Sequence, residues 1–286
     1  MIIADALAPL LNEHGRFTIL ALDHRDSLRI EFKPDDPASV PIEAMVQFKL
    51  DVIDVLGNRP SAIMLDPELS IDQVLRAGRM PAGVGSLCAL EAQGYLADPD
   101  IAVNHLLDGW SPQRAKDVGA SAAKLLVLYR PDRGAVTAAQ DDLIRSVAED
   151  CAAARLPLFV EPVPYDLADV DDRERTVVES AVRIAALGPD VIKMPFPSTA
   201  DRPDRWEAAC RRVNNAIDLP WAVLSWGASF ELFVRQTEVA CANGCAGFMA
   251  GRAIWADSIH AENRAERLAH VAVPRFEALV AATSGR

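Results

Sequence analysis

The sequence predicts a (β/α)8 barrel that spans the whole chain, residues 1–286, as a single domain. Eight short apolar runs have the length of β-strands and lie at residues 18–23, 62–66, 83–87, 123–128, 158–161, 190–193, 221–225 and 247–251. Segments with apolar residues at helical spacing separate most of these runs, at 44–56, 138–154, 173–187, 205–217 and 229–242. Strands that alternate with helices form a parallel sheet, and eight such units in about 250 residues match a closed barrel.

Turn signals in front of the strands support this reading. Gly188-Pro189 and Asn243-Gly244 are typical of a helix that stops and feeds a strand. The alternative fold is an open doubly wound sheet, but no glycine fingerprint follows the first strand. No linker or internal repeat divides the chain. Residues 261–282 have apolar positions at helical spacing, which favours packing on the barrel and leaves a homo-oligomer contact as the alternative.

Composition and charge exclude several classes of partner. The formal net charge of -12 argues against nucleic acid, because phosphate backbones require clustered Lys and Arg. Small anionic substrates stay open, since a few local cations or backbone amides bind one phosphate. No run of 18 apolar residues predicts a membrane span, and the first residues lack the basic start of a secretory signal. Five scattered cysteines without such a signal indicate reduced thiols and a cytoplasmic location.

Several predicted strands end in a polar or otherwise unusual residue: Asp23, Asp66, Glu161, Lys193, Ser225 and Gly251. The C-terminal strand ends of a barrel of this kind form its active face, so we expect these residues to converge on one mouth. A single polar strand end is commonplace, whereas six at one mouth predict a functional site.

Lys193 is the residue with the clearest chemical meaning, because it follows a buried apolar run. Burial disfavours the charged form of a lysine, and the neutral amine is a nucleophile that forms Schiff bases with ketones and aldehydes. Glu161 ends the preceding strand, which lies directly beside it in a barrel, and Pro162 after it favours an extended exit. Its carboxyl group would shuttle protons during carbinolamine formation and carbon–carbon cleavage.

Lys124 and Asp23 are the next candidates. A second ammonium group near Lys193 would favour the neutral amine, because like charges disfavour each other. Lys124 would serve in this way, or bind a substrate hydroxyl or phosphate, or pair with Asp23 or Glu161 inside the barrel. Asp23 would accept hydrogen bonds from substrate hydroxyls or hold Lys124.

Two glycine-containing segments after the seventh and eighth strands predict a phosphate site. They are Ser225-Trp226-Gly227 and Gly251-Arg252, at the usual position for phosphate in these barrels. Arg252 adds a fork-shaped donor for phosphate or sulfonate oxygens. Of the five histidines only His24 lies at a strand end, so we expect no zinc site and no cofactor.

Two other functions use the same barrel. A phosphosugar isomerase or epimerase would use Glu161 as a base and need no imine. A non-catalytic sugar-phosphate sensor would bind the ligand without turnover.

Six segments also resemble a known family in the same order: residues 21–25 (Ala-Leu-Asp-His-Arg), 124–129, 160–162, 191–193, 224–227 and 248–255. They are similar to the class I tagatose-1,6-bisphosphate aldolases and the related sulfofructosephosphate aldolases over about residues 16–256. The resemblance implies a (β/α)8 barrel that cleaves ketose phosphates through an imine on Lys193, with Glu161 as proton shuttle. It places Asp23 and Lys124 against substrate hydroxyls. It places the dihydroxyacetone phosphate group on Ser225, Gly227, Gly251 and Arg252.

The chain departs from the family pattern at three places near the mouth. His24 stands where the family has Gln, and would change the aldehyde that fits or add a titrating group. The family's acid two residues after its lysine is missing from Lys193-Met194-Pro195, and Trp226 replaces a smaller residue. These departures leave the identity of the ketose phosphate or sulfonate open.

Overall fold

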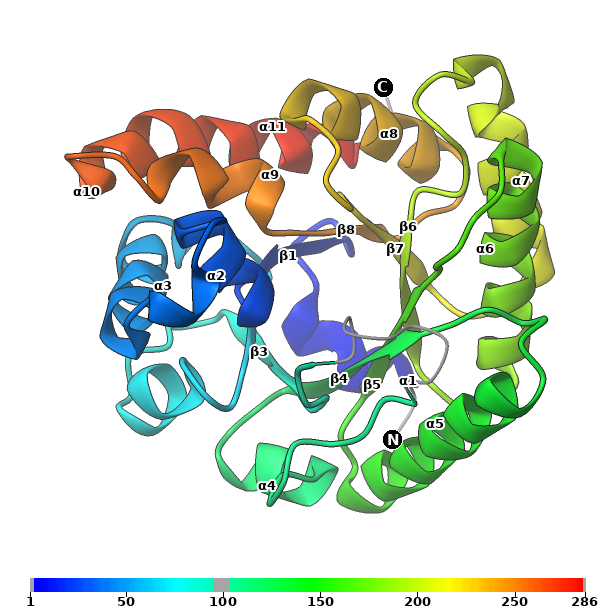
Figure 1. The fold of residues 1–286 in the computed structure, drawn as a ribbon, viewed down its shortest axis with the longest axis horizontal. Coiled ribbons are helices and arrows are strands. Elements are labelled where there is room, and N and C mark those ends of the chain that lie inside the picture. Colours follow the sequence, from blue (N-terminus) through cyan, green and yellow to red (C-terminus); the bar gives the residue numbers. More distant parts are fainter. Residues whose placement is uncertain (1–2, 95–102, 285–286) are drawn as a thin grey trace.

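The computed structural model describes residues 3–94 and 103–284. Eight parallel strands in these residues close into a barrel in the order β1 to β8, which confirms the predicted fold (Figure 1). The strands are β1 (Phe17–Ala21), β2 (Ala62–Leu65), β3 (Gly85–Ala89), β4 (Ala122–Leu128), β5 (Leu158–Val163), β6 (Val191–Pro195), β7 (Trp221–Leu224) and β8 (Gly247–Ala250). Pairing of β1 with β8, with Phe17 opposite Gly247, closes the ring.

The helices lie around the strands as an outer layer, except α1, which lies at one end of the barrel (Figure 1). They are α1 (Ile3–Leu7), α2 (Asp26–Phe32), α3 (Ile42–Leu56), α4 (Pro112–Asp117), α5 (Ala135–Ala154), α6 (Val170–Ala185), α7 (Trp206–Ala216), α8 (Phe230–Ala242), α9 (Arg252–Trp255), α10 (Arg264–Arg267) and α11 (Val273–Ala282). The five helices predicted from periodicity correspond to α3 and α5–α8, with ends shifted by a few residues. Between β2 and β3 there is only a short helical turn, Asp72–Arg76.

Local sequence sets where these helices begin and end. Asp169 accepts a hydrogen bond from the Asp172 amide at 2.8 Å and so begins α6. Ser229 does the same for the Leu232 amide at the start of α8. Gly188 follows the end of α6 and Gly244 follows the end of α8, with φ of 96° and 98°, in the left-handed region that glycine enters without strain. The predicted helix stops at these glycines are confirmed.

Alternate residues of each strand point into the barrel, and the interior toward the N-terminal ends of the strands is apolar. The buried cluster there consists of Leu7, Leu10, Phe17, Ile19, Ala62, Met64, Leu87, Ala122, Phe159, Val191, Ala222 and Met249. The rings of Phe17 and Phe159 meet edge to face at 5.5 Å across this space. Leu7 of α1 and Leu10 just after it join the cluster, so the first residues close one end of the barrel.

The C-terminal segment packs against the barrel, as predicted. Leu268, Phe276 and Leu279 are fully buried, and the Phe276 ring contacts Phe248 of β8 at 5.6 Å. Within residues 3–94 and 103–284, none of the helices has the length and apolar character that crossing a lipid bilayer requires.

Two strands are longer than predicted. β5 continues through Pro162 to Val163, and β6 continues through Met194 to Pro195. Glu161 and Lys193 therefore lie inside strands rather than at their ends, and the extended backbone predicted at Glu161 is confirmed as part of β5. Because hydrogen-bonded strands hold both residues, their side chains have a fixed position relative to each other.

Candidate active site

A layer of charged side chains lies directly above the apolar layer of the barrel. Lys124, Glu161 and Lys193 each stand two positions after an apolar inward residue of the same strand, namely Ala122, Phe159 and Val191. The period of two in a strand aims all three into the barrel. The predicted convergence of Glu161 and Lys193 is therefore present, and Lys124 lies beside them.

Lys193 and Glu161 form a buried pair. The Lys193 Nζ lies 2.8 Å from Glu161 Oε2, and the two side chains are 6% and 8% exposed. The Met64 sulfur, at 3.7 Å, is the other neighbour of this nitrogen. A carboxylate at hydrogen-bond distance can take up the proton that a lysine must lose before its nitrogen attacks a carbonyl group.

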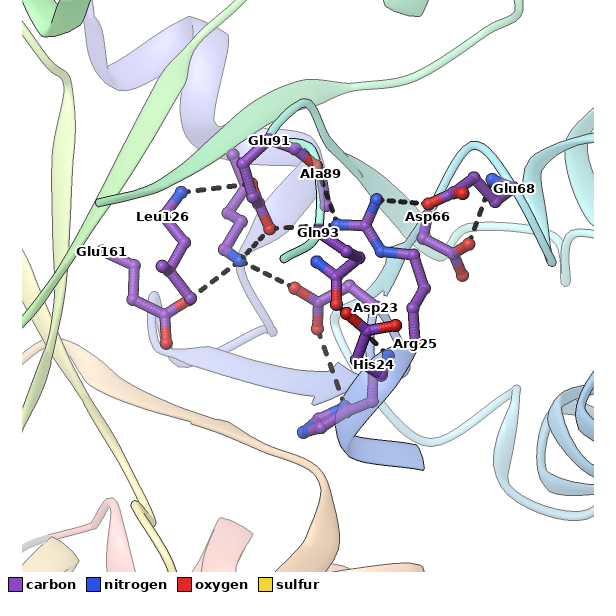
Figure 2. Close-up of polar contacts among 12 residues, drawn as sticks. Asp23, His24, Arg25, Asp66, Glu68, Ala89, Glu91, Gln93, Leu126 and Glu161 are labelled. Carbon is purple, nitrogen blue, oxygen red and sulfur yellow. Dashed lines mark hydrogen bonds and ion pairs between the residues drawn. The ribbon is translucent and has the colours of Figure 1, made fainter. Parts of the chain in front are cut away.

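Lys124 binds three carboxylates at once. Its Nζ lies 2.7 Å from Glu91 Oε1, 2.9 Å from Asp23 Oδ2 and 3.0 Å from Glu161 Oε2, and its side chain is 1% exposed. Figure 2 shows Asp23, Glu91 and Glu161 directed toward this nitrogen, from the segments after β1 and β3 and from β5. The prediction that Lys124 pairs with Asp23 or Glu161 is confirmed for both. Glu161 thus accepts from two ammonium groups through one oxygen.

Glu91 is a site residue that sequence reasoning missed. Its side chain is 2% exposed, and Oε2 accepts a hydrogen bond from the Leu126 amide at 3.1 Å. Arg25 donates to the Glu91 backbone carbonyl at 2.9 Å and also pairs with Glu68 at 2.8 Å (Figure 2). β3 ends later than predicted, and the inward positions 87, 89 and 91 continue its period of two. That alternation was the signal for Glu91.

The ammonium groups change the proton affinity of the carboxylates. Burial alone would raise the pKa of Asp23, but the charges of Lys124 and Lys193 outweigh it and hold the pKa far below its usual range. The same two charges lower the pKa of Glu161 against burial. Both carboxylates are therefore ionised at neutral pH.

His24 lies beside this group as a neutral imidazole. Burial lowers its pKa to about 3, and the nearby charges of Arg252 and Lys193 add to this effect although Asp23 opposes it. The ring meets Trp255 edge to face at 5.1 Å. Its Nδ1 is buried and makes no hydrogen bond within the described residues, and Asp23 Oδ1 is 3.8 Å away. The titrating group near neutral pH that the sequence suggested is not found, because the pKa is too low.

These groups line a cavity of about 290 Å³ at the C-terminal ends of the strands. Lys193 borders this cavity, and so do seven other residues that the sequence predicted for the site: Asp23, His24, Lys124, Glu161, Ser225, Gly251 and Arg252. Gly251 is required by close packing, because a Cβ there would lie 2.5 Å from the Ala21 carbonyl oxygen and 2.6 Å from the His24 ring. The backbone at Gly251 therefore packs so closely against Ala21 and His24 that no side chain fits there.

Two predicted members lie elsewhere. Asp66 is fully buried beneath the cavity wall, where it forms an ion pair with Lys49 of α3 and accepts from the Leu69 amide at 2.7 Å. The prediction that Asp66 converges on the mouth was wrong. β2 ends at Leu65, and the turn that follows holds the Asp66 side chain through the Leu69 amide. Gly227 does not line the central cavity but borders a second one next to it.

Arg252 reaches the central cavity with an acidic partner. Its Nη1 lies 3.3 Å from Glu31 Oε1, and both side chains are about one third exposed, at 36% and 33%. An incoming anion would compete with Glu31 for the guanidinium group. Within the described residues, no group of three or more His, Cys, Asp and Glu side chains has an arrangement that could hold a metal ion.

Comparison with known proteins agrees with this geometry. Residues 17–257 match the DeoC/LacD family aldolase. The chain is 28% identical over 275 residues to "Tagatose 1,6-diphosphate aldolase 2" of Streptococcus agalactiae, which covers 87% of this chain and 83% of that protein. It is 30% identical over 275 residues to the protein of that name from Streptococcus pyogenes, with the same coverage of 87% and 83%.

Solved structures share the fold. An archaeal fructose 1,6-bisphosphate aldolase superposes with a TM-score of 0.66 at 16% identity, over 96% of this chain and 99% of that one. The fructose-bisphosphate aldolase from Plasmodium falciparum gives a TM-score of 0.73 at 17% identity, over 99% and 94%. The match over residues 17–257 covers most of the chain, and the protein belongs to the DeoC/LacD family of aldolases.

Proposed function

We propose that this chain is a class I aldolase that cleaves a phosphorylated ketose through an imine on Lys193. The observation that carries the proposal is the 2.8 Å contact between Lys193 Nζ and Glu161 Oε2 inside a cavity at the active end of the barrel. The names of the relatives, tagatose 1,6-diphosphate aldolases, favour a ketose 1,6-bisphosphate as the substrate.

Glu161 would carry the protons that move while the carbinolamine and the imine form. It takes a proton from Lys193, whose nitrogen attacks the ketone carbon and gives a carbinolamine. Protonation of the carbinolamine hydroxyl by Glu161 releases water and leaves a cationic imine. A carboxylate then takes the proton of the C4 hydroxyl, the C3–C4 bond breaks with its electron pair moving toward the imine, and the aldehyde leaves. Protonation of the resulting enamine and hydrolysis release dihydroxyacetone phosphate and restore Lys193.

The remaining residues would bind the substrate. Asp23, fixed by Lys124, is placed to accept hydrogen bonds from the sugar hydroxyls, and neutral His24 borders the same space. Ser225, Gly251 and Arg252 would hold the phosphate of the dihydroxyacetone half. No cofactor enters this sequence of steps.

Trapping the imine tests the proposal directly. The protein is reduced with borohydride in the presence of dihydroxyacetone phosphate, digested, and its peptides are mapped by mass spectrometry. We expect one stable adduct, on Lys193. The Lys193→Met variant is expected to form no adduct and to lose turnover.

The matched control is Lys116→Met, which removes a lysine of α4 outside the cavity. This variant is expected to keep both the adduct and the turnover. An active wild-type protein without an adduct on Lys193, or turnover that survives in Lys193→Met, would overturn the imine mechanism.

A further inference from the structure

A second cavity of about 240 Å³ lies next to the central one, between the segments that follow β6 and β7. Ser225 and Trp226 line both cavities, so one short segment separates them. Trp226 has a φ of 42°, in the left-handed region that a bulky residue rarely enters. The chain therefore holds a large aromatic side chain in a strained conformation at the boundary.

Arg173 of α6 supplies a positive charge to this second cavity. Its guanidinium group stacks on the Trp226 ring at 4.5 Å and donates to the backbone carbonyls of Phe196 at 2.9 Å and Ser198 at 3.1 Å. Its neighbours on α6 show the contrast, because Arg175 and Arg183 both pair with aspartates. Arg173 has no carboxylate partner within the described residues, and its Nη1 makes no hydrogen bond there.

Desolvation accounts for the state of this arginine. Burial lowers the pKa of Arg173 to about 10, with no opposing contribution from an acid. The group is still charged at neutral pH, so a desolvated cation borders the cavity without a counter-ion. A bound anion would remove this imbalance.

Gln236 of α8 supplies a second polar side chain to the same cavity. Its side chain is 5% exposed, it lines the cavity, and it makes no hydrogen bond to any described residue. Its amide atoms are not among the fully enclosed atoms that lack a partner, so they face the open space of the cavity. The amide of Gln236 is therefore placed to donate to a ligand.

The rest of the lining also suits an anion. The cavity wall contains Ser198, Thr199, Gly227 and Ala228, together with Leu232 from the first turn of α8. The chain has a net charge of -12, yet no Asp or Glu is among the residues that line this cavity. The central cavity, in contrast, is bordered by three carboxylates, Asp23, Glu91 and Glu161.

We propose that this second cavity is an anion subsite for a phosphate group, held by Arg173, Gln236 and the backbone at Gly227. Two sources carry the required chemistry, namely the distal phosphate of a ketose bisphosphate and free inorganic phosphate. The first assignment rests on the proposed aldolase function, whereas the second does not. Gly227, which the sequence predicted to bind phosphate, belongs to this subsite.

The test combines binding and kinetics. Calorimetric titration with inorganic phosphate at constant ionic strength measures binding in the wild type and in Arg173→Met and Gln236→Leu. The KM values are then compared for a ketose 1,6-bisphosphate and for the ketose 1-phosphate, which lacks the distal group. Arg252→Ala serves to remove binding in the central cavity, and Arg175→Met removes an exposed charge from the same helix as a matched control.

If the subsite takes the distal phosphate, Arg173→Met raises the bisphosphate-to-monophosphate ratio of KM at least ten-fold. If it takes free phosphate, Arg173→Met weakens by at least ten-fold the phosphate binding that survives in Arg252→Ala, and the KM ratio stays constant. Gln236→Leu raises the KM ratio in the first case and weakens phosphate binding in the second, each by a smaller factor than Arg173→Met. It also decides the question should Arg173→Met fail to fold.

The proposal is wrong if phosphate binding and the KM ratio in both Arg173→Met and Gln236→Leu equal those of the Arg175→Met control. The phosphate titration needs no imine chemistry. A failure of the aldolase mechanism would therefore appear separately, in the borohydride experiment.

Discussion

Oε2 of Glu161 lies 2.8 Å from the nitrogen of Lys193 and so places the proposed base directly against the proposed nucleophile. The same oxygen is 3.0 Å from the Lys124 nitrogen. Lys124 keeps Glu161 ionised, and an ionised Glu161 can accept the proton of Lys193. The site therefore depends on one carboxylate shared between two lysines.

Replacing this carboxylate tests its role in proton transfer. Glu161→Gln keeps the shape and a hydrogen bond but cannot take up a proton, so we expect kcat to fall by about 10²–10⁴-fold, the usual contribution of a positioned acid or base. Single-turnover kinetics with the ketose phosphate measure this loss. Glu179→Gln, on the exposed face of α6, is the control. A Glu161→Gln enzyme with wild-type kcat would exclude Glu161 as the shuttle.

Removing Lys124 leaves buried carboxylates without their counter-ion. Lys124→Met should lower the free energy of unfolding by about 3–5 kcal/mol at pH 7, the cost of breaking a buried ion pair. The loss should shrink in acid, where Asp23 and Glu161 take up protons. Urea unfolding at several pH values measures both effects. A destabilisation that does not change with pH would show that lost packing, rather than charge, is responsible.

His24 should make the protein less stable in mild acid. Its pKa is lowered in the folded chain from 6.5 to about 3, so between these values the unfolded chain binds a proton that the folded chain does not. Stability is therefore full above pH 6.5 and falls as the pH drops, by about 2–3 kcal/mol at pH 4.5. Unfolding free energies of His24→Gln should lose this dependence between pH 6.5 and 4.5. The exposed His14 provides the control variant His14→Gln.

Arg252 should affect substrate binding more than turnover. Arg252→Ala removes a charged donor from the proposed phosphate position, and we expect KM to rise by about 10–100-fold, which corresponds to the 1.5–3 kcal/mol of a hydrogen bond to a charged group. Glu31→Gln, which frees Arg252 from its partner at 3.3 Å, should lower KM. Steady-state kinetics measure both changes. A loss confined to kcat would contradict a binding role.

The sequence predicted the barrel and most of its central layer because strand period and strand order are local properties. Lys124, Glu161 and Lys193 lie on inward positions of their strands, and closure of the barrel brings them together. The sequence did not reveal the final positions of Glu91 and Asp66, because both residues lie in the segments that follow β3 and β2. Glu91 enters the site because the chain after β3 continues inward, while Asp66 is withdrawn by its pairing with Lys49. Such pairings depend on contacts between distant segments.

The groups proposed for catalysis are carried by strands, whereas Trp226 and Gly227 belong to the short segment after β7. Redesign of that segment can therefore alter which molecules enter without displacing the lysine and glutamate below. Directed evolution toward new aldehyde or ketone substrates would start at Trp226, because this one side chain borders both the central and the second cavity.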